Sequence, residues 1–479
     1  MKQIVYIISL YFMCISCSDF LDYKDNDKVI PDELDQYSEL VLGELIQQSM
    51  GASCYNLWIM SDDFGTFVPS WIGDRTVDTR ESYQNWYGWA KESQITPKGD
   101  EKIDPAWEHF YHKVLMCNII EADVNKFADD AEGVKHRLLG EVQALRAMSY
   151  WYLLNMYGEP YRGEEQARTA MGVPINKETS IKDELYERAT LREVYGLIEE
   201  NLKSALQHLE QGEQKNTIFR PNKDVVRLFL SRIYLEQKRY DDVITVCNDA
   251  LKETMRTIIP VSEMLTYQDS QKPMLNKDNN SMIFSWFNRD GYPGSSVSDY
   301  SSGRYCPTED LVALFVSNDI RKYPNVSWDG NKHNIRKYGA STSGCGDMNY
   351  RVEEIYFNRA EAYIEKGEWK LGMKDINEVY SKRLEDGSGH LEATNVDDAR
   401  TYLRNEKRKE FCFEDIRWFD IRRWGLVIEH KFYNFSMDGT YFTYILEAES
   451  PNYVLPLPLD IQRRNYKIEQ PKRVEIQTK

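Results

Sequence analysis

Two short stretches of this 479-residue chain share one pattern of residues. Residues 233–240 read IYLEQKRY, and residues 362–369 read AYIEKGEW. In both, apolar residues at helical spacing are followed by a short polar turn, an aromatic residue and a second helical pattern. A helix pair of this kind has an apolar face that it cannot bury alone, so it must stack on further helices. The chain is therefore expected to contain layers of helical hairpins.

These hairpins are tetratricopeptide-like, but they lie much farther apart than the roughly 34-residue period of a continuous solenoid. They are therefore expected to be embedded in a larger fold. Three further segments, 103–127, 134–157 and 190–209, carry apolar residues at helical spacing, and Gly158 with Pro160 ends the second of them. The sequence predicts a mainly α fold.

Two regions lack helical periodicity and are expected to form loops. Residues 257–350 are rich in Gly, Ser, Asn, Asp and Pro, and residues 60–104 are rich in Gly, Asp and Trp. A compact fold does not usually retain such long irregular segments unless they have a function. We therefore expect a helical scaffold that supports a loop-rich, ligand-binding half.

The amino terminus predicts export. Lys2 precedes an apolar run from Ile4 to Ile15 that is interrupted only by Ser9. A run of this length is too short to span about 30 Å of hydrocarbon and is typical of a secretory signal. Cys17 follows it, an arrangement that resembles a bacterial lipoprotein signal, in which the cysteine is lipidated.

This reading divides the chain into three parts. Residues 1–16 are predicted to be the signal peptide, 17–30 an acidic tether, and 31–479 one domain with halves of about 31–215 and 216–479. No other segment of the sequence has about 18 consecutive apolar residues. The mature protein is expected to be anchored by lipid and not to cross the membrane.

The charge of the chain excludes several classes of partner. With 60 Lys and Arg against 77 Asp and Glu, the formal net charge is −17. Nucleic acids need a basic surface, so DNA or RNA binding is not expected. Direct docking on anionic lipid is disfavoured for the same reason. The sequence has no CxxC pair, and no metal or cofactor is predicted.

Five motifs, in order along almost the whole chain, resemble those of the SusD/RagB family of Bacteroidetes outer-membrane lipoproteins. They match the mature amino terminus of that family, its LRA…YG motif, its AEA helix, its RWFDLRRW signature and its LPIP segment. In this sequence they are Cys17–Asp22, Ala144–Pro160, Asn358–Tyr363, Glu406–Trp424 and Leu455–Pro458.

The resemblance implies a SusD-like fold, with four tetratricopeptide-like units supporting a loop-rich half. It also implies capture of a nutrient, most often a glycan, at the cell surface. The implied partner is a SusC-like TonB-dependent β-barrel transporter that the lipoprotein caps. The implied location is the outer membrane, with the protein facing the cell exterior.

Aromatic residues are concentrated in residues 55–111, which hold five of the 11 Trp. Sugar rings need an aromatic platform together with planar donors and acceptors. We assign Trp107 to the core because it lies in an amphipathic helix. Tyr83, Trp86 and Tyr87 fit either a packed helix face or a binding site. The predicted ligand-binding residues of this region are Trp71, Asp74, Arg75, Tyr83 and Trp86.

A second aromatic cluster lies in the later loop region, where burial is harder to arrange. Trp71 and Trp328 in particular are expected to be accessible, to share one face and to stack on ligand. Neighbours such as Pro69 and Gly330 indicate loops around them. The predicted ligand-binding residues of this cluster are Tyr292, Tyr300, Arg304, Tyr305 and Trp328.

Several motifs that could suggest an enzyme or a metal site are interpreted as structural. Asp62 and Asp63 are adjacent, whereas a glycosidase needs two carboxylates on opposite sides of the bond. His109 and His112 lack a further ligand at helical spacing. Residues 343–347 lack the strand–turn–helix setting of a nucleophile motif. The sequence therefore predicts that the protein is not an enzyme.

The remaining charged and sulfur-containing residues are also predicted to be structural. Residues 404–423 alternate Arg and Lys with Glu and Asp, which indicates a network of ion pairs. A disulfide between Cys306 and Cys345 is left open, because spacing cannot set their distance. Four cysteines with apolar neighbours are predicted core thiols: Cys54, Cys117, Cys247 and Cys412.

The sequence therefore favours a non-enzymatic glycan-binding lipoprotein. The first alternative is an oligopeptide-binding lipoprotein of the RagB type, because Asp74, Arg75 and Arg304 near the aromatics also suit peptide termini. The second is an intracellular tetratricopeptide scaffold, which a soluble, unlipidated protein in native cells would support.

Overall fold

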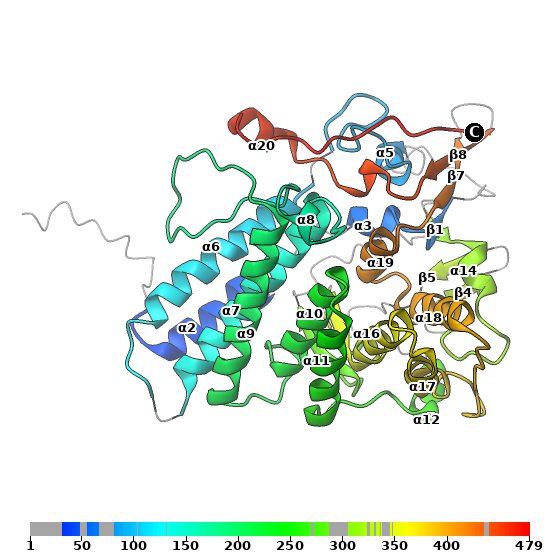
Figure 1. Cartoon of the computed structure of the whole chain (residues 1–479), viewed down its shortest axis with the longest axis horizontal. Helices are drawn as coiled ribbons and strands as arrows, with labels where there is room; N and C mark the ends of the chain where they lie inside the picture. The colour runs from blue at the N-terminus through cyan, green and yellow to red at the C-terminus, as the bar shows by residue number, and fades with distance from the viewer. Residues whose placement is uncertain are drawn as a thin grey trace, which may run out of the picture.

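The fold is mainly helical, as predicted, with short antiparallel sheets between helices (Figure 1). It begins with α2 (Leu34–Leu40) and the π-helix η2 (Val41–Gln47). The computed structural model describes residues 31–47, 55–66, 81–102, 104–130, 132–269, 273–286, 305–322, 326–329, 332–335, 337, 345–346, 348–434 and 440–479.

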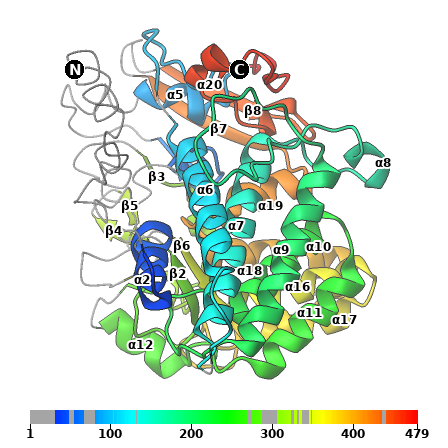
Figure 2. The same ribbon diagram turned by 90° about the vertical axis from the view of Figure 1, so that its left-hand side faces the viewer.

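Three long helices build the amino-terminal part of the scaffold: α6 (Ala106–Val124), α7 (Val134–Tyr157) and α9 (Leu191–Gln211). Each falls within two or three residues of its predicted range. The middle helix, α7, lies against both α6 and α9 and is buried around most of its circumference (Figure 2). Gly140 allows this approach, because a Cβ there would lie 2.7 Å from Cγ of Leu209.

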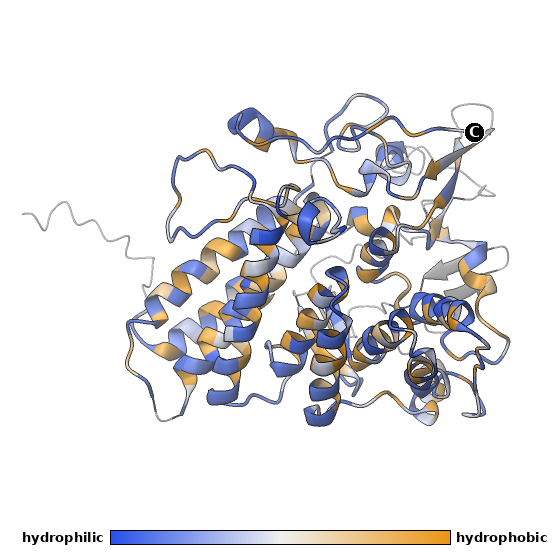
Figure 3. Ribbon diagram, viewed as in Figure 1, coloured by the Kyte–Doolittle hydropathy of each residue, from blue (hydrophilic) through white to orange (hydrophobic). Residues whose placement is uncertain are grey.

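The two similar sequence stretches form the predicted helical hairpins. The first joins α10 (Lys223–Glu236) to α11 (Tyr240–Glu253), and the second joins α16 (Val352–Glu365) to α17 (Trp369–Tyr380). The hairpins stack through α11 and α16. Apolar residues concentrate on the faces that meet inside the molecule (Figure 3).

The two hairpin turns have the same geometry. Lys238 and Gly367 occupy the same turn position with positive φ angles of 57° and 83°. In both turns the residue after it donates a backbone hydrogen bond of 2.8 Å to the carbonyl four residues before the turn position, at Tyr234 and Tyr363. The second turn uses glycine, which adopts this conformation without strain. The shared geometry confirms the internal similarity read from the sequence.

The region 257–350, predicted to consist of turns and loops, contains more regular structure than expected. Its described residues include strands and helices too short to show a periodic pattern, so periodicity alone could not reveal them. The elements are α12 (Val261–Asp269), β2 (Met282–Trp286), β3 (Cys306–Pro307), α14 (Glu309–Ala313), β4 (Val326–Asp329), β5 (Lys332–Ile335) and β6 (Met348–Arg351).

The described residues form four antiparallel strand pairs. Two of them, β1 with β3 and β2 with β6, join segments distant in sequence, and the other two, β4 with β5 and β7 with β8, are hairpins. The remaining elements are α3 (Tyr55–Ile59), β1 (Phe64–Gly65), α5 (Gln84–Tyr87), α8 (Glu164–Ala167), α18 (Val396–Phe411), α19 (Ile416–Trp424), β7 (Ile428–Asn434), β8 (Thr440–Leu446), η5 (Pro451–Tyr453) and α20 (Leu459–Arg464). Among the described residues no helix is both long and apolar enough to span a membrane.

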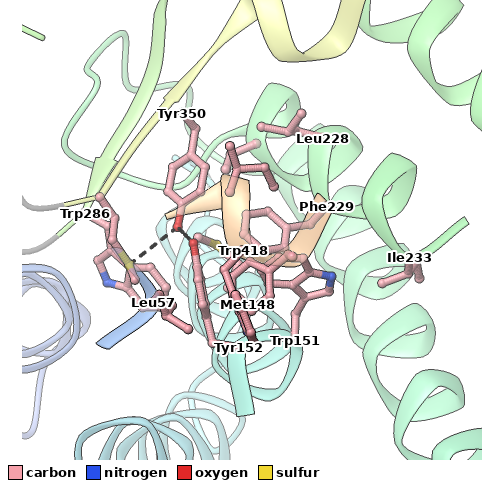
Figure 4. Close-up of a cluster of buried hydrophobic side chains, with 14 of the residues drawn as sticks. Leu57, Met148, Trp151, Tyr152, Leu228, Phe229, Ile233, Trp286, Tyr350 and Trp418 are labelled. Carbon is pink, nitrogen blue, oxygen red and sulfur yellow. Dashed lines mark hydrogen bonds between the residues drawn. The ribbon is translucent and has the colours of Figure 1, made fainter. Parts of the chain in front are cut away.

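A large aromatic core connects the long helices to the hairpins (Figure 4). Tyr152 on α7 and Tyr350 on β6 share a hydrogen bond of 2.9 Å between their hydroxyls. Trp286 on β2 donates to the Leu45 carbonyl at 2.8 Å, so its indole nitrogen is satisfied in the core. Trp107 is also buried, which confirms its assignment to the core.

Ion pairs fill the space around α18, as the alternating charges of residues 404–423 predicted. Glu410 is fully buried and accepts hydrogen bonds from Arg351 at 2.7 Å, Arg383 at 3.0 Å and Arg321 at 3.3 Å. Burial by itself would raise the pKa of Glu410, but the three guanidinium groups hold that pKa well below its usual range. Removing one side of such a buried cluster leaves uncompensated charge.

We predict that Glu410→Gln lowers the free energy of unfolding at pH 7 by about 3–5 kcal/mol, as measured by urea denaturation. The folded-state pKa of Glu410 lies well below the ordinary glutamate value of 4.5. The stabilisation is therefore fully present above that pH and is lost as the pH falls through the folded-state value. The gap between the two proteins should narrow in acid. Glu392→Gln, at an exposed site, is the matched control and should change stability by less than about 0.5 kcal/mol.

Candidate ligand-binding site

Of the eleven residues predicted to bind ligand or carry lipid, the structure describes the side chains of three: Tyr83, Trp86 and Tyr305. For Trp328 it describes the backbone alone. The other seven lie outside the described residues: Cys17, Trp71, Asp74, Arg75, Tyr292, Tyr300 and Arg304.

Trp86 and Tyr305 do not fit their predicted role as ligand contacts. Trp86 is 1% exposed and Tyr305 is 3% exposed, and both belong to the main hydrophobic core. The Tyr305 ring packs on the Tyr87 ring with centroids 5.3 Å apart. Neither residue offers a free aromatic face, so both act in packing. Of the two interpretations of the 83–87 segment, the packed face holds for Trp86 and Tyr87.

Tyr83 remains partly exposed next to this core. The Lys102 ammonium lies 4.2 Å from the centroid of its ring, within the range of a cation–π contact. Tyr83 therefore stays a predicted ligand-binding residue, and Lys102 covers part of its ring.

The backbone at Trp328 is a strand and not the loop that its neighbours suggested. In the β4–β5 pair, Trp328 lies opposite His333. Asp329 and Lys332 are the last paired residues before the connection. The Asp-Gly-Asn sequence thus marks a hairpin turn between two short strands.

The β7–β8 hairpin carries an aromatic pair that sequence analysis did not single out. Tyr433 and Tyr441 lie directly opposite each other, with ring centroids 4.9 Å apart. Tyr441 is 52% exposed and Tyr433 is partly exposed. The signal for it was the alternating TYFTYIL run at 440–446, which places Tyr441 and Thr443 on one face of a strand.

Hydrogen bonds dock this hairpin onto α5 and β1. Tyr87 donates its hydroxyl to the Lys431 carbonyl at 3.0 Å, and Gln84 donates to the Tyr444 hydroxyl at 2.8 Å. Thr66 donates to the same Lys431 carbonyl at 2.8 Å and accepts from the Tyr433 amide at 2.9 Å. Segments from both ends of the chain thereby form one surface, where α5, β7 and β8 lie together in Figures 1 and 2.

A buried histidine fills the space beneath the surface. The His430 ring stacks on Tyr87 with centroids 4.2 Å apart and lies at the same distance from the Trp89 ring. Its two ring nitrogens lie 2.8 Å from the Tyr87 carbonyl and 2.9 Å from the Ser61 carbonyl. Burial lowers the pKa of His430 to about 4, so the ring is neutral at pH 7. It acts as a polar core residue.

The adjacent aspartates fix the start of this surface, in agreement with their structural interpretation. Asp62 accepts two hydrogen bonds of 2.7 Å from Arg417 on α19, and Asp63 accepts one of 2.9 Å from Arg408 on α18. Burial by itself would raise the pKa of Asp62, but Arg417 and Arg408 hold that pKa well below its usual range. These carboxylates are engaged in ion pairs and are not arranged as an acid–base pair.

The cysteines of the described residues are free thiols, and most of them are buried. Cys306 and Cys345 are thiols in this structure, and Cys306 donates a hydrogen bond to the Gly65 carbonyl at 3.6 Å. Three predicted core thiols are confirmed as buried, at positions 117, 247 and 412, and Cys54 lies outside the described residues. The described part of the chain contains no group of three His, Cys, Asp or Glu residues suited to a metal ion.

The fold and this surface define a class of protein: a stacked helical scaffold that presents a surface of short strands and connecting segments. Comparison with known protein families identifies the class to which this fold belongs. Residues 19–235 match the SusD-like family model described as "Starch-binding associating with outer membrane", and residues 320–470 match that of the SusD family. The chain belongs to the SusD/RagB family, as its five motifs predicted.

Individual relatives are distant but match over nearly the full length. SusD-like protein P25 of Formosa agariphila is 18% identical, over 89% of this chain and 90% of its own. A solved structure described as a putative sugar binding protein from Bacteroides vulgatus is 21% identical, with a TM-score of 0.73 over 91% of this chain and 97% of its own. A SusD superfamily protein from Bacteroides thetaiotaomicron is 19% identical, with a TM-score of 0.73 over 92% and 100%.

We predict that Trp86→Ala lowers the free energy of unfolding by about 3–5 kcal/mol, because a buried indole is replaced by a cavity. Tyr441→Ala, on the exposed pair, should cost less than about 1 kcal/mol. Urea denaturation of the two variants measures both effects. A Trp86 variant as stable as the wild type would return that side chain to the list of surface ligand contacts.

Proposed function

We propose that this protein is a non-catalytic, cell-surface glycan-binding lipoprotein that delivers oligosaccharide to a SusC-like TonB-dependent transporter in the outer membrane. Membership of the SusD/RagB family is the observation that carries the proposal. The family model matched by residues 19–235 is described as starch-binding and associated with the outer membrane. The structural neighbour from Bacteroides vulgatus is described as a putative sugar binding protein.

The surface chemistry of the β7–β8 hairpin supports a carbohydrate ligand. Tyr433 and Tyr441 present adjacent aromatic rings, at least one of them half-exposed, and sugar rings pack on such faces through their C–H groups. Tyr83, which is next to Gln84 in the sequence, adds a further partly exposed aromatic ring. These residues stand on segments that the Thr66 and Gln84 hydrogen bonds hold together.

The predicted loop residues complete the proposed site. Thr66 is the last described residue before the segment that holds Trp71, Asp74 and Arg75. Tyr305 is the first described residue after the segment that holds Tyr292, Tyr300 and Arg304, and it packs on Tyr87 beneath the hairpin. Both segments are therefore attached next to the β7–β8 surface, which supports one shared binding face.

The engaged carboxylates support a binding protein over a hydrolase. Asp62 and Asp63 are held by Arg417 and Arg408, so neither is available to transfer a proton or attack a sugar carbon. In the proposed mechanism, recognition depends on stacking and hydrogen bonds, and the ligand leaves chemically unchanged.

We predict that Trp71→Ala or Trp328→Ala weakens binding of the preferred oligosaccharide about five- to a hundredfold, because each removes one stacking contact. Isothermal titration calorimetry of a glycan panel gives the change. Trp151→Ala is the matched control: its indole is buried in the core, so the change should lower stability by about 3–5 kcal/mol without removing a ligand contact. Binding to peptides alone would contradict the glycan proposal and favour the oligopeptide alternative.

The proposed membrane attachment depends on Cys17. We predict that Cys17→Ala moves the protein from the membrane fraction to the soluble fraction of cells and abolishes incorporation of labelled palmitate, because acyl chains supply the anchor. Cys412→Ala, at a buried core position, should leave both measurements unchanged. Membrane association that persists in the Cys17 variant would show that another segment or a partner holds the protein there.

A further inference from the structure

A pocket of about 380 Å³ lies beside α20, away from the aromatic pair of the β7–β8 hairpin. One wall comes from the chain that leads into α6, and the other from the Leu-Pro-Leu-Pro segment and the start of α20, at the upper edge of the molecule in Figure 1. Its lining includes Gln94, Glu101, Lys102, Asp104, Trp107 and Arg463.

The side chain of Gln94 indicates that this pocket takes a hydrogen-bond donor. Gln94 is 6% exposed, and its Oε1 atom is buried with no hydrogen-bond partner among the described residues. A buried acceptor without a donor is destabilising, and Gln94 combines this state with a place in the lining of a pocket. A ligand that enters the pocket and donates a hydrogen bond would remove this cost.

Asp104 supplies a second acceptor with unused capacity. It is 5% exposed and accepts from the Ala106 amide at 3.1 Å and from the Tyr157 hydroxyl at 2.8 Å. These two donors are neutral, and no basic side chain of the described residues pairs with the carboxylate. Burial raises the pKa of Asp104 to about 6, which shows that its negative charge lacks compensation.

Each of the two cationic side chains at the pocket, Arg463 and Lys102, already has a partner within the protein. Arg463 pairs with Glu101 at 3.1 Å, and Lys102 lies over the Tyr83 ring at 4.2 Å. Two further carboxylates, Glu108 and Asp460, also line the pocket. The groups that remain for a ligand are therefore mostly hydrogen-bond acceptors and negative charges, beside the Trp107 indole.

We propose that this pocket binds a primary ammonium group on the captured ligand, carried by an amino sugar residue or by the amino terminus of a peptide. An ammonium group offers three donors and a positive charge, which match Gln94 Oε1 and the Asp104 carboxylate. The Trp107 ring adds a favourable surface for a cation. A metal ion fits less well, because the described residues include no cluster of three metal-ligating side chains and the pocket is far larger than one ion.

This inference rests on the proposed function in that it assumes a captured ligand, and it specifies one chemical group of that ligand. The two sources of the amine correspond to the glycan and peptide alternatives. Binding at this pocket can therefore be measured separately from binding at the aromatic face.

The test uses the mature chain without its signal peptide and four small probes. Glucosamine and glycylglycine carry the amine, and N-acetylglucosamine and N-acetyl-glycylglycine are their neutral counterparts. Affinities are measured by nuclear magnetic resonance titration at pH 7. We expect at least one amine to bind about tenfold or more tightly than its acetylated counterpart. Preference confined to glucosamine indicates an amino sugar, and preference confined to glycylglycine indicates a peptide.

Two variants connect the preference to the pocket. Gln94→Leu and Asp104→Asn should each reduce the preference for the amine over its acetylated counterpart by at least about fivefold. Gln207→Leu, at an exposed position on α9, should leave this preference unchanged. Thermal unfolding of each variant shows whether it is folded. Equal binding of amine and acetylated probes by wild type, or an unchanged preference in a folded Gln94 variant, overturns the proposal. Loss of oligosaccharide binding at the aromatic face, with the amine preference intact, would contradict the proposed function alone.

Discussion

The Glu410 carboxylate connects segments of the chain that lie far apart in the sequence. Its three arginine partners come from the segment after α14, from the end of β6 and from the segment after α17, while Glu410 itself lies on α18. Burying these charges is costly, and the cost is offset only when every partner is in place. The cluster thus makes the position of α18 depend on the hairpin of α16 and α17 and on the strand β6.

The proposed binding surface depends on the same helices. Arg408 on α18 and Arg417 on α19 hold Asp63 and Asp62. Those aspartates fix the strand β1, and β1 in turn docks the β7–β8 hairpin through Thr66. A chain of ion pairs and hydrogen bonds therefore runs from the centre of the helical scaffold to the exposed tyrosine pair. This gives the surface a rigid base even though it is assembled from short elements.

The sequence predicted the helices well because their information is local. The range 134–157 matches α7 to the residue, and the aligned turns at Lys238 and Gly367 share one geometry. Family motifs added the fold class. The burial of Trp86 and Tyr305 could not be predicted, because the residues that cover this region, such as His430 and Phe432, lie more than a hundred positions away in the sequence. The strands were missed since most span only two to five residues.

The candidate site shows the same division between local and distant information. Composition indicated that residues 55–111 were important, and the ion pairs of residues 404–423 were recognised from their alternating charges. Sequence analysis did not find the Tyr433–Tyr441 pair, because only strand pairing brings the two rings together. Nor did it find the pocket at Gln94, whose walls come from opposite ends of the chain.

The burial of α7 on nearly all sides has a consequence for how the protein matures. A helix that is buried on nearly all sides is not stable in water by itself, so α7 depends on being covered by its neighbours. Its two main neighbours, α6 and α9, are the long helices that precede and follow it in the sequence, although residues 158–190, which include α8, separate α7 from α9. Coverage therefore needs only local chain closure, which is fast and has a low entropic cost. A chain that emerges amino terminus first can therefore cover its most extensively buried helix before the carboxy-terminal half has folded.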